Sequence, residues 1–539
     1  MNILLVTEPG VNGVFRYVEA LSHFLLSRGV RVHLAYSDVR GSDRLPLLVR
    51  RIEAAGGRTL NLRVDSRPAL RDLPALYRLW KFTRQIRPDL IHSHSSKAGA
   101  LARLLGYAGL DCPQLYHAHA YRGMQPEAGR LVGIFNLAET VLGQVGATIS
   151  CSEDERAFAT GRLGLAPERC FLIPNAVDCA RFHPVGEERK KTLREQFKLP
   201  LDAPVLGAVC RSSVQKDPFT LYKAFALALP ECPDAWLFHV GEGELDPQLE
   251  TLLDELGVRA RVVRLPYLPN TAEAYQAADG FILTSRYEGF SLAALEALAT
   301  NLPVILSEAP GTGDLIRLPL SHRWNARPGN VAGFVEVIRS WYRDLAARRP
   351  INHVEIIRES FDSAVTFGRV SGLYEAQIAA ARTETPVLTR LWSQALLAVG
   401  GLGIVAALFL SLKRSGDVPF TRFTPDWLTL WVNHHGVMRN FSAYAALALP
   451  FLLREARFPG RVRTALLLAA LAIGLECAQL FIPTRWFDLR DIATSVAGIG
   501  VVWAVLETVR RRQAPARESF RHPPHPATLR ATEAVRTPN

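Results

Sequence analysis

Two glutamates, Glu288 and Glu296, stand in the segment Arg286-Tyr-Glu-Gly-Phe-Ser-Leu-Ala-Ala-Leu-Glu296. Glu288 precedes a glycine and is expected in a loop, whereas Glu296 falls in an apolar helix that begins near residue 292. A helix N-terminus presents unpaired N–H groups and the positive end of its dipole, so it attracts anions. Two carboxylates beside it can accept hydrogen bonds from hydroxyls. This spacing also occurs on solvated helix faces, so the interpretation as a site for an anionic, hydroxyl-rich ligand such as a sugar nucleotide depends on other motifs.

A pair of cations precedes these glutamates. Arg211 and Lys216 follow an apolar run at residues 205–209, which is typical of a buried strand. Arginine offers a planar fork and lysine a point charge, and together they suit a diphosphate. A solvated basic loop is the alternative, and the two glutamates downstream favour the binding site.

The N-terminal segment is typical of a parallel α/β domain. An apolar run at residues 2–7 predicts a buried strand, Gly10 and Gly13 follow it, and residues 15–27 have the pattern of an amphipathic helix. A dinucleotide fingerprint would need a third glycine, which is absent, and Asp38 after the second predicted strand (30–36) is a weak match to its acidic residue. An NAD-dependent dehydrogenase is therefore a poor alternative.

In combination, these motifs resemble those of family 4 glycosyltransferases over residues 1–380. The resemblance implies an α/β protein of the GT-B fold, with two facing Rossmann-like domains. It implies that the diphosphate of a nucleoside-diphosphate sugar is held by cations and by amides at the helix end, that Glu288 binds donor-sugar hydroxyls, and that Glu296 binds the ribose. His119, in Tyr116-His-Ala-His-Ala-Tyr-Arg-Gly123, matches the histidine placed near the reacting sugar. The implied site comprises His119 and Glu288 as catalytic residues and Gly13, Arg211, Lys216, Ser291, Leu292 and Glu296 as donor-binding residues.

The sequence departs from the family pattern in several loops. Asn12-Gly13 stands where a Gly-Gly pair is usual, and Ala176 replaces a common glycine after Asn175. Cys210 and Asp217 replace glycines that flank the cation loop. These changes concern how closely the backbone approaches a ligand and leave the two cations in place.

Four histidines alternate along two predicted extended segments, at positions 92, 94, 117 and 119. A metal site is one interpretation of this pattern. No carboxylate pair accompanies the histidines, and the family resemblance implies a retaining enzyme that needs no metal. We therefore expect no metal and no cofactor.

Hydrophobicity changes near residue 390. Residues 394–412 carry no charge over 19 positions, and residues 464–483 carry only Glu476, so both approach the ~20 residues that span a bilayer. Shorter apolar runs at 441–453, which contains Pro450, and 492–506 predict two more helices, with buried or re-entrant helices as the alternative. We expect an all-α transmembrane bundle of about four helices.

The distribution of charge and the pattern of cysteines predict where in the cell the protein lies. Arg454, Arg457, Arg461 and Arg463 lie between the second and third expected spans, and Arg510-Arg511-Arg512 follow the fourth, so both groups should face the cytoplasm. Seven scattered cysteines without a Cys-x-x-Cys motif indicate a reducing compartment. No secretory signal is recognised at the N-terminus. We expect a multi-pass protein of the inner (plasma) membrane with a cytoplasmic catalytic part.

The membrane part has its own polar pattern. An ionisable residue within a span is a functional candidate. The pattern, which resembles VanZ-like membrane domains over residues 415–507, consists of Glu476, Gln479, Arg485, Asp488 and Asp491. A polar network that locks the bundle and a site for a polar ligand or lipid headgroup are equally good interpretations.

The predicted domains are an acceptor-side domain (1–182), a donor domain (183–362), a crossover helix and linker (363–385), a VanZ-like transmembrane domain (391–509) and a basic, proline-rich tail (510–539). Expected donor-domain strands are 205–209, 236–240, 280–283 and 303–306.

The formal net charge of +12 includes seven arginines within residues 510–539, and flanking membrane helices explain these more simply than nucleic acid does. Expected partners are a nucleoside-diphosphate sugar, commonly a UDP-sugar in this family, a lipid-linked or glycan acceptor, and membrane lipids, in exopolysaccharide or envelope glycan synthesis. The alternatives are a nucleotide-sugar epimerase of GT-B fold and a nucleotide-sugar sensor attached to a VanZ-like module.

Overall fold

A computed structural model of the protein describes residues 1–382 and 436–513, apart from residues 11, 67–68, 70–71, 108–109, 111, 126–128, 130–131, 269, 347–350, 456–457 and 480–487. The chain divides into two compact units. One contains both β-sheets, and the other contains the helices after residue 436.

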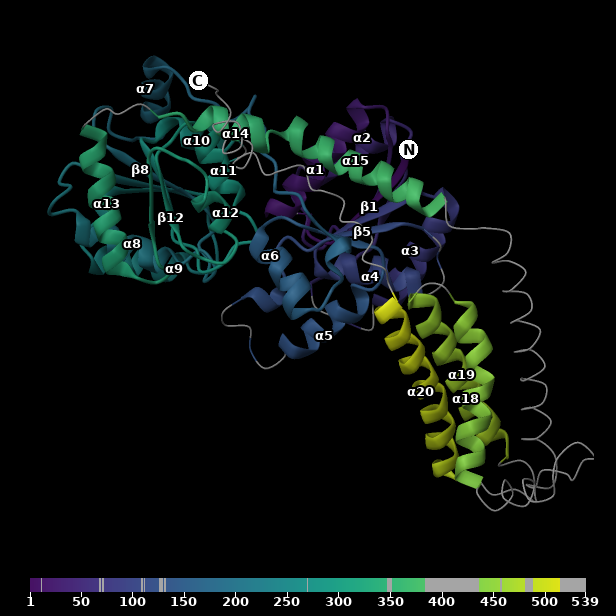
Figure 1. Ribbon diagram of the computed structural model, residues 1–539. Coiled ribbons are helices and arrows are strands. Elements are labelled where there is room, and N and C mark those ends of the chain that lie inside the picture. The colour runs from purple at the N-terminus through teal and green to yellow at the C-terminus, as the bar shows by residue number, and fades with distance from the viewer. Residues whose placement is uncertain are drawn as a thin grey trace, which may run out of the picture. The chain divides into compact units, whose positions relative to one another are not determined.

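The first sheet has seven parallel strands in the order β3-β2-β1-β4-β5-β6-β7. Figure 1 shows this sheet with β1 and β5 labelled. Its core is formed by apolar side chains of the central strands and of α1, which explains why these strands are nearly continuous apolar runs. The strands are β1 (Asn2–Thr7), β2 (Arg31–Tyr36), β3 (Thr59–Asn61), β4 (Leu90–His94), β5 (Gln114–His117), β6 (Ala147–Ser150) and β7 (Cys170–Leu172). The helices are α1 (Asn12–Ser27), α2 (Leu45–Ala54), α3 (Asp72–Ile86), α4 (Ser96–Tyr107), α5 (Val132–Leu142) and α6 (Glu153–Ala157).

The second sheet has six parallel strands in the order β10-β9-β8-β11-β12-β13. In each sheet the strand order reverses beside a central strand, between β1 and β4 and between β8 and β11. Ligands of such sheets bind outside the carboxyl ends of the strands at this point. The strands are β8 (Val205–Val209), β9 (Trp236–Val240), β10 (Val262–Leu265), β11 (Gly280–Leu283), β12 (Val304–Ser307) and β13 (Arg323–Ala326). The helices are α7 (Glu187–Gln196), α8 (Pro218–Ala228), α9 (Asp246–Glu255), α10 (Ala272–Ala277), α11 (Leu292–Ala299), α12 (Gly313–Ile316), α13 (Val331–Ala346) and α14 (His353–Phe361).

The long helix α15 (Ser363–Arg382) follows the second sheet but packs on the core of the first. Phe367, Val370 and Tyr374 of this helix are at most 1% exposed and lie among the side chains of α1. A chain that leaves one sheet and returns to the other ties the two halves of this unit together. The prediction of two parallel, Rossmann-like α/β halves is confirmed.

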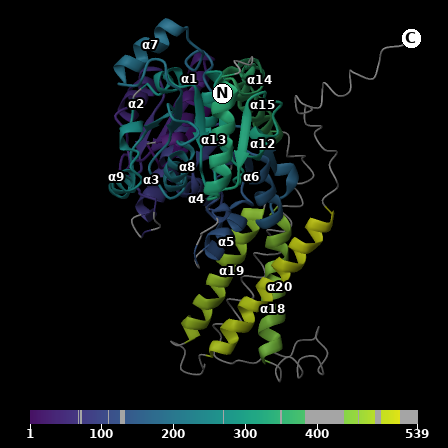
Figure 2. The ribbon, with the colours of Figure 1, turned by 90° about the vertical axis from the view of Figure 1, so that its left-hand side faces the viewer.

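The second unit contains three described helices, α18 (Gly436–Arg454), α19 (Phe458–Gln479) and α20 (Leu489–Gln513), which lie side by side (Figure 2). Leu447, Leu468 and Ile499 are among the residues of their shared core. Helix α18 continues through Pro450, and the first expected span, 394–412, lies outside the described residues.

One helix within the described residues, Leu489–Thr508, is long and apolar enough to cross a membrane, with a mean hydropathy of 1.5. Asn440–Leu453 is a shorter apolar helix. A bundle of four spans therefore stays a prediction.

An unexpected ion pair lies inside this helical unit. Arg461 of α19, which the charge pattern assigned to a cytoplasmic loop, donates from Nη2 to Oε2 of Glu507 on α20 at 2.7 Å. Both residues are less than 10% exposed. Arg461 is thus partly neutralised, and it is a weaker indicator of membrane orientation than its sequence position suggested.

Candidate functional site

A cleft of about 710 Å³ lies between the two sheet-bearing halves, at the carboxyl ends of their central strands. Its walls include residues that follow β1, β5, β8 and β11. All eight residues of the site predicted for these halves line this one cleft: Gly13, His119, Arg211, Lys216, Glu288, Ser291, Leu292 and Glu296.

The predicted donor-sugar carboxylate is paired with one of the predicted cations. Lys216 Nζ lies 2.5 Å from Oε1 of Glu288, and Ser285 Oγ donates to the same oxygen at 2.6 Å. Glu288 is only 6% exposed, and its backbone N–H donates to the carbonyl of Pro310 at 2.8 Å. Because Glu288 sits in a loop fixed at both backbone and side chain, its carboxylate is held in one position beside the cation.

The second carboxylate is held from both halves of the unit. Arg16 of α1 donates from Nη1 to Oε1 of Glu296 at 3.0 Å, and the Tyr275 hydroxyl donates to Oε2 at 2.7 Å. Arg16 is oriented by a further bond from Nη2 to Thr271 Oγ1 at 2.8 Å. Burial raises the pKa of Glu296 above its ordinary value, while Arg16 and Tyr275 oppose that shift. An ion pair at the cleft wall therefore occupies the expected ribose site.

The N-terminus of α11 opens into the cleft. Ser291 is its N-cap, and Ser291 Oγ accepts the N–H of Ala294 at 3.3 Å. This cap satisfies one backbone amide of the first turn. The amides of Leu292 and Ala293 stay at the N-terminal end of the helix, and both residues line the cleft. From the opposite wall, Gly13 approaches Leu292 so closely that a β-carbon added there would lie 3.5 Å from Leu292 Cδ1.

The loop that carries His119 has an unusual backbone. His119 has φ +57° and Ala120 has φ +107°, values that non-glycine residues rarely adopt. Glu155 stabilises the loop because Oε1 accepts the N–H of Ala120 at 2.7 Å, and Oε2 accepts that of Cys151 at 2.6 Å. Burial lowers the pKa of His119 to about 3, so its imidazole is neutral at pH 7. The ring is held by His94, with 3.2 Å between His94 Nδ1 and His119 Nε2.

The cation loop explains one departure from the family pattern. Asp217, which stands where the family has glycine, has φ +47° and is the N-cap of α8, with its side chain accepting the N–H of Thr220. It also lies 3.3 Å from Arg286 Nε. Asp217 adopts a left-handed conformation, which glycine tolerates most easily, and it caps the helix.

The polar residues predicted in the membrane part are described only in part. Glu476 is buried in α19, at 7% exposed. Asp488 is exposed before α20 and its Oδ1 accepts the N–H of Arg490 at 2.8 Å, while Asp491 lies in the first turn. Arg485 and the side chain of Gln479 lie outside the described residues, so the assembly of this group stays a prediction.

Several residues that line the cleft or bond to its lining were not assigned a role from the sequence. Arg16 and Tyr275 bind Glu296, Ser285 binds Glu288, and Asn175 donates from Nδ2 to the carbonyl of Phe290 at 2.9 Å. Arg16 follows Gly13 on the helix that opens at the cleft, and this position was the one local signal of its role. A second cavity, of about 620 Å³ and lined by Met124, Phe158 and Ile316 among others, contains none of the predicted site residues.

Comparison with known families agrees with this geometry. Residues 11–181 match the model described as Glycosyltransferase Family 4, and residues 189–353 match the model described as Glycosyl transferases group 1. The first match covers strands β2 to β7 of the seven-stranded sheet, and the second covers all the strands of the six-stranded sheet. These are the domains of a GT-B glycosyltransferase. The resemblance of the first 380 residues is confirmed at this level, whereas the VanZ-like resemblance is not tested by these matches.

Two curated relatives illustrate the range of similar proteins. The UDP-Gal:alpha-D-GlcNAc-diphosphoundecaprenol alpha-1,3-galactosyltransferase of Escherichia coli is 28% identical over 257 residues, which cover 46% of this chain and 65% of that protein. The D-inositol 3-phosphate glycosyltransferase of Geodermatophilus obscurus is 29% identical over 351 residues, covering 58% and 74%. The chain thus spans less than two thirds of the length of the first relative.

Solved structures share the fold. Anabaena Alr3699/HepE in complex with UDP-glucose matches with a TM-score of 0.60 and 20% identity, covering 70% of this chain and all of that one. The sucrose-phosphate synthase of Thermosynechococcus elongatus matches with a TM-score of 0.57 and 20% identity over the same shares. In both cases the remaining 30% of this chain lies outside the shared GT-B fold.

Proposed function

We propose that this chain is a retaining, metal-independent glycosyltransferase that moves a sugar from a nucleoside-diphosphate sugar to an acceptor hydroxyl. The observation that carries the proposal is the convergence of two cations, two carboxylates, one helix N-terminus and one histidine in a single cleft. These groups come from both halves of the unit, so a ligand bound to all of them would bridge the two sheets.

The site can lower the reaction barrier by stabilising the charge that forms on the leaving diphosphate. Breaking the bond between the sugar C1 and the phosphate oxygen develops negative charge on the diphosphate. Arg211, Lys216 and the amides of α11 stabilise that charge as it forms, and such differential stabilisation lowers the barrier. The acceptor oxygen then bonds to C1, and the leaving phosphate takes the acceptor's proton. Glu288, already fixed beside Lys216, accepts hydrogen bonds from hydroxyls of the donor sugar.

His119 is proposed to contact the reacting sugar. Its neutral imidazole can accept or donate one hydrogen bond without placing a second positive charge beside C1. The hydrogen bonds from the backbone to Glu155 fix the strained loop that presents the ring. Closure of the two halves around the donor would exclude water and limit hydrolysis.

A UDP-sugar is the proposed donor. The printed name of the E. coli relative specifies UDP-Gal, and solved structures of the same fold contain UDP or UDP-glucose. Glu296, paired with Arg16 at the cleft wall, is proposed to accept hydrogen bonds from the ribose hydroxyls. When the nucleotide binds, Arg16 and Tyr275 would either keep their hydrogen bonds to the Glu296 carboxylate or release it.

A lipid-linked acceptor, in exopolysaccharide or cell-envelope glycan synthesis, is the proposed second substrate. The E. coli relative is named for a diphosphoundecaprenol acceptor. In this chain, Ile134, Leu137 and Val141 expose 64%, 65% and 41% of their surface on one face of α5, which suits contact with membrane lipids.

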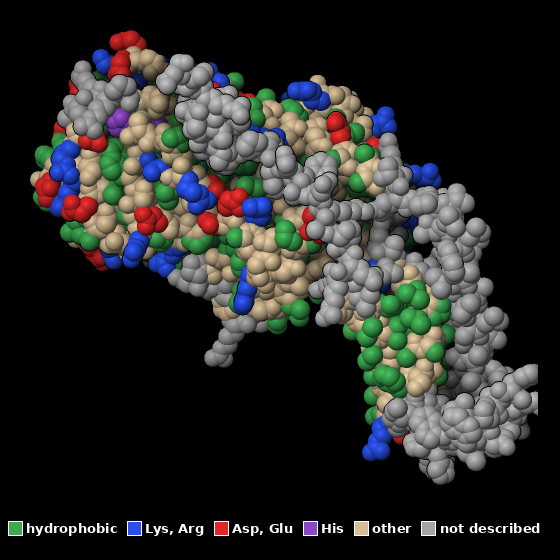
Figure 3. All heavy atoms as spheres, in the orientation of Figure 1, with side chains coloured by type: hydrophobic (Ala, Val, Ile, Leu, Met, Phe, Trp, Pro, Cys, Tyr) green, Lys and Arg blue, Asp and Glu red, His purple; other side chains and the backbone are tan. Residues whose placement is uncertain are grey.

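The helical unit is proposed as the membrane anchor, with the catalytic domains on the cytoplasmic side, where nucleotide sugars are made. Figure 3 shows hydrophobic side chains gathered on the outside of these helices. Leu466 and Leu467 of α19 and Val501 and Val505 of α20 are 49–65% exposed. Within a water-soluble protein such a surface would be costly, whereas lipid tails would cover it.

Donor binding tests the proposal. The full-length chain, purified in detergent, is heated with UDP-, GDP- and ADP-sugars while its unfolding is followed. We expect one nucleotide class to raise the melting temperature, and the Lys216→Ala variant to lose that shift. A folded protein that responds to none of the donors would contradict the proposal.

A further inference from the structure

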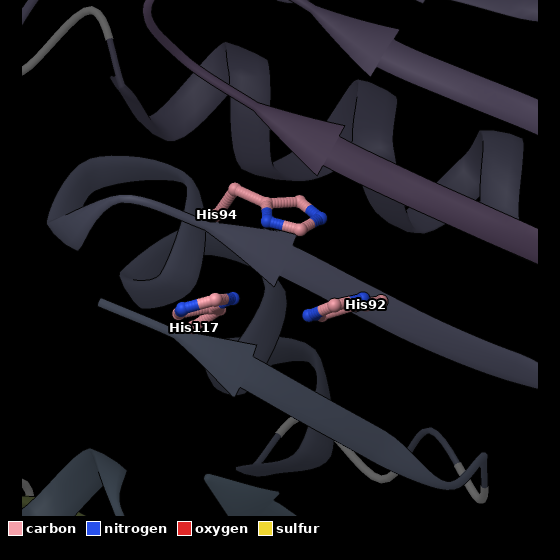
Figure 4. A group of neighbouring side chains, drawn as sticks. All are labelled: His92, His94 and His117. Carbon is pink, nitrogen blue, oxygen red and sulfur yellow. The ribbon is translucent and has the colours of Figure 1, made fainter. Parts of the chain in front are cut away.

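Three buried histidines form a compact group beneath the cleft. His92 and His94 lie on β4 and His117 on β5, where the parallel register places His94 opposite His117. Because strand side chains alternate, His92 and His94 lie on the same face. Figure 4 shows the three imidazole rings on these neighbouring strands, turned toward a common space. All three residues are completely buried.

Four imidazole nitrogens of this group have no hydrogen-bond partner within the described part of the chain: Nε2 of His92, Nε2 of His94, and both nitrogens of His117. The other nitrogens are engaged, since His92 Nδ1 lies 2.6 Å from the Tyr374 hydroxyl and His94 Nδ1 lies 3.2 Å from His119 Nε2. An unsatisfied buried polar group destabilises the folded protein. Several in one place indicate that something else bonds to these nitrogens.

The three rings are close enough to share one partner. One nitrogen from each of the three histidines lies within 4.8 Å of the other two. Zinc binds histidine nitrogen at about 2.0–2.1 Å and in many sites takes three protein ligands. Nitrogens around such an ion lie roughly 3.4 Å apart in tetrahedral geometry, so small side-chain rotations would bring the rings into place.

We propose that His92, His94 and His117 form a binding site for one transition-metal ion, with Zn²⁺ the favoured occupant. Three neutral imidazoles suit zinc, copper and nickel, and they do not suit Mg²⁺ or Ca²⁺, which require oxygen ligands. Metal-bound histidines usually bond through the other ring nitrogen to a polar partner, as His92 does to Tyr374 and His94 to His119.

A counter-charge is available beside the group. Atoms of His117, Cys151 and Glu155 also lie within 4.8 Å of one another, and all three are buried. The sequence showed no carboxylate pair beside these histidines, and this was one of the two reasons to expect no metal. The fold brings Glu155 of α6 close to His117.

The metal content of the full-length chain tests this site independently of any transferase activity. The protein carries a streptavidin-binding tag in place of a histidine tag, is produced in medium containing zinc, copper, nickel and manganese, and is dialysed against a weak chelator. Mass spectrometry of the elements should find about one zinc per chain, and X-ray absorption should show histidine nitrogens at about 2.0 Å.

The matched variants are His117→Phe and His239→Phe. His239 is equally buried, but its nitrogens are partnered, by the Tyr222 hydroxyl at 2.8 Å and the Cys210 carbonyl at 3.1 Å. We expect His117→Phe to lose the metal and His239→Phe to keep it, with circular dichroism confirming that each is folded. A wild-type protein with no bound transition metal, an absorption spectrum without histidine ligands, or a folded His117→Phe protein that keeps its metal would overturn the proposal.

Discussion

The guanidinium of Arg16 lies 3.0 Å from the carboxylate of Glu296, joining α1 on one side of the cleft to α11 on the other. The Tyr275 hydroxyl binds the second oxygen of the same carboxylate. Residues 280 positions apart thus meet where a nucleotide ribose is proposed to bind. The proposed binding of the donor ribose and the contact between the two halves therefore use the same carboxylate, that of Glu296.

This pairing predicts a pH dependence of nucleotide affinity. Burial raises the pKa of Glu296 and the charge of Arg16 lowers it. If the ionised carboxylate accepts the ribose hydroxyls, affinity falls as pH falls through that pKa. Replacing Arg16 with alanine removes the lowering effect, so the loss of affinity should move to higher pH. Calorimetric titration with a UDP-sugar between pH 5 and 8 measures this shift, because the diphosphate of a UDP-sugar, unlike the terminal phosphate of UDP, does not titrate in that range.

Glu296→Gln is the control for that experiment. An amide does not titrate in this range, so the variant should bind weakly with little dependence on pH. Identical pH profiles for the wild type, Arg16→Ala and Glu296→Gln would show that Glu296 does not contact the nucleotide.

Lys216→Ala should affect the chemical step more than folding. It removes a cation from the developing diphosphate charge and leaves Glu288 without its partner. Loss of one such group typically lowers turnover about 10²–10³-fold. Lys223→Ala, on the exposed face of α8, is the matched control and should keep wild-type turnover. Release of nucleoside diphosphate measures both, and equal rates would remove Lys216 from the mechanism.

Gly289 tests the contact between its loop and the His119 loop. A β-carbon at position 289 would lie 2.8 Å from the carbonyl oxygen of His119, closer than real contacts allow. Gly289→Ala should therefore displace the His119 loop and lower transfer at least tenfold, about 1.4 kcal/mol in the barrier, while UDP binding changes less.

Gly372→Ala, in α15 with open space around its added methyl group, should leave transfer unchanged and stabilise the protein by about 0.4–1 kcal/mol. Full activity in Gly289→Ala would mean that the two loops separate during turnover.

The membrane anchor can be tested on α20. Val501 and Val505 are about half exposed and lie in the apolar stretch Leu489–Thr508. Lysine at the centre of a span costs about 2.5–3.5 kcal/mol. Val501→Lys combined with Val505→Lys should therefore lower the fraction of the chain that carbonate-washed membranes retain, whereas the leucine pair should keep that fraction at the wild-type level. A wild-type chain recovered in the carbonate supernatant would exclude an integral anchor.

The sequence predicts some parts of this structure better than others. Strands 205–209, 236–240 and 280–283 have the predicted bounds, because a strand buried on both faces is a continuous apolar run with polar ends. The strand predicted at 303–306 is displaced by one residue, to Val304–Ser307.

The site residues with local signatures, such as Lys216 and Glu288, line the cleft as predicted. Arg16 has only its place after Gly13 as a local signal, and its partner Glu296 lies 280 residues away. Glu155 binds the amide of Ala120, 35 residues away, as well as that of the nearby Cys151. Their roles follow only from the way the fold brings distant segments together.

The most direct test of the central claim is sugar transfer by the full-length chain. Purified protein is incubated with a labelled nucleotide sugar and a membrane lipid extract, and labelled lipid and free nucleoside diphosphate are quantified. We predict both products from the wild type and losses of at least 100-fold in folded Glu288→Gln and Lys216→Ala proteins. Full transfer by these two variants, or conversion of the donor into an isomeric nucleotide sugar without transfer, would contradict the account.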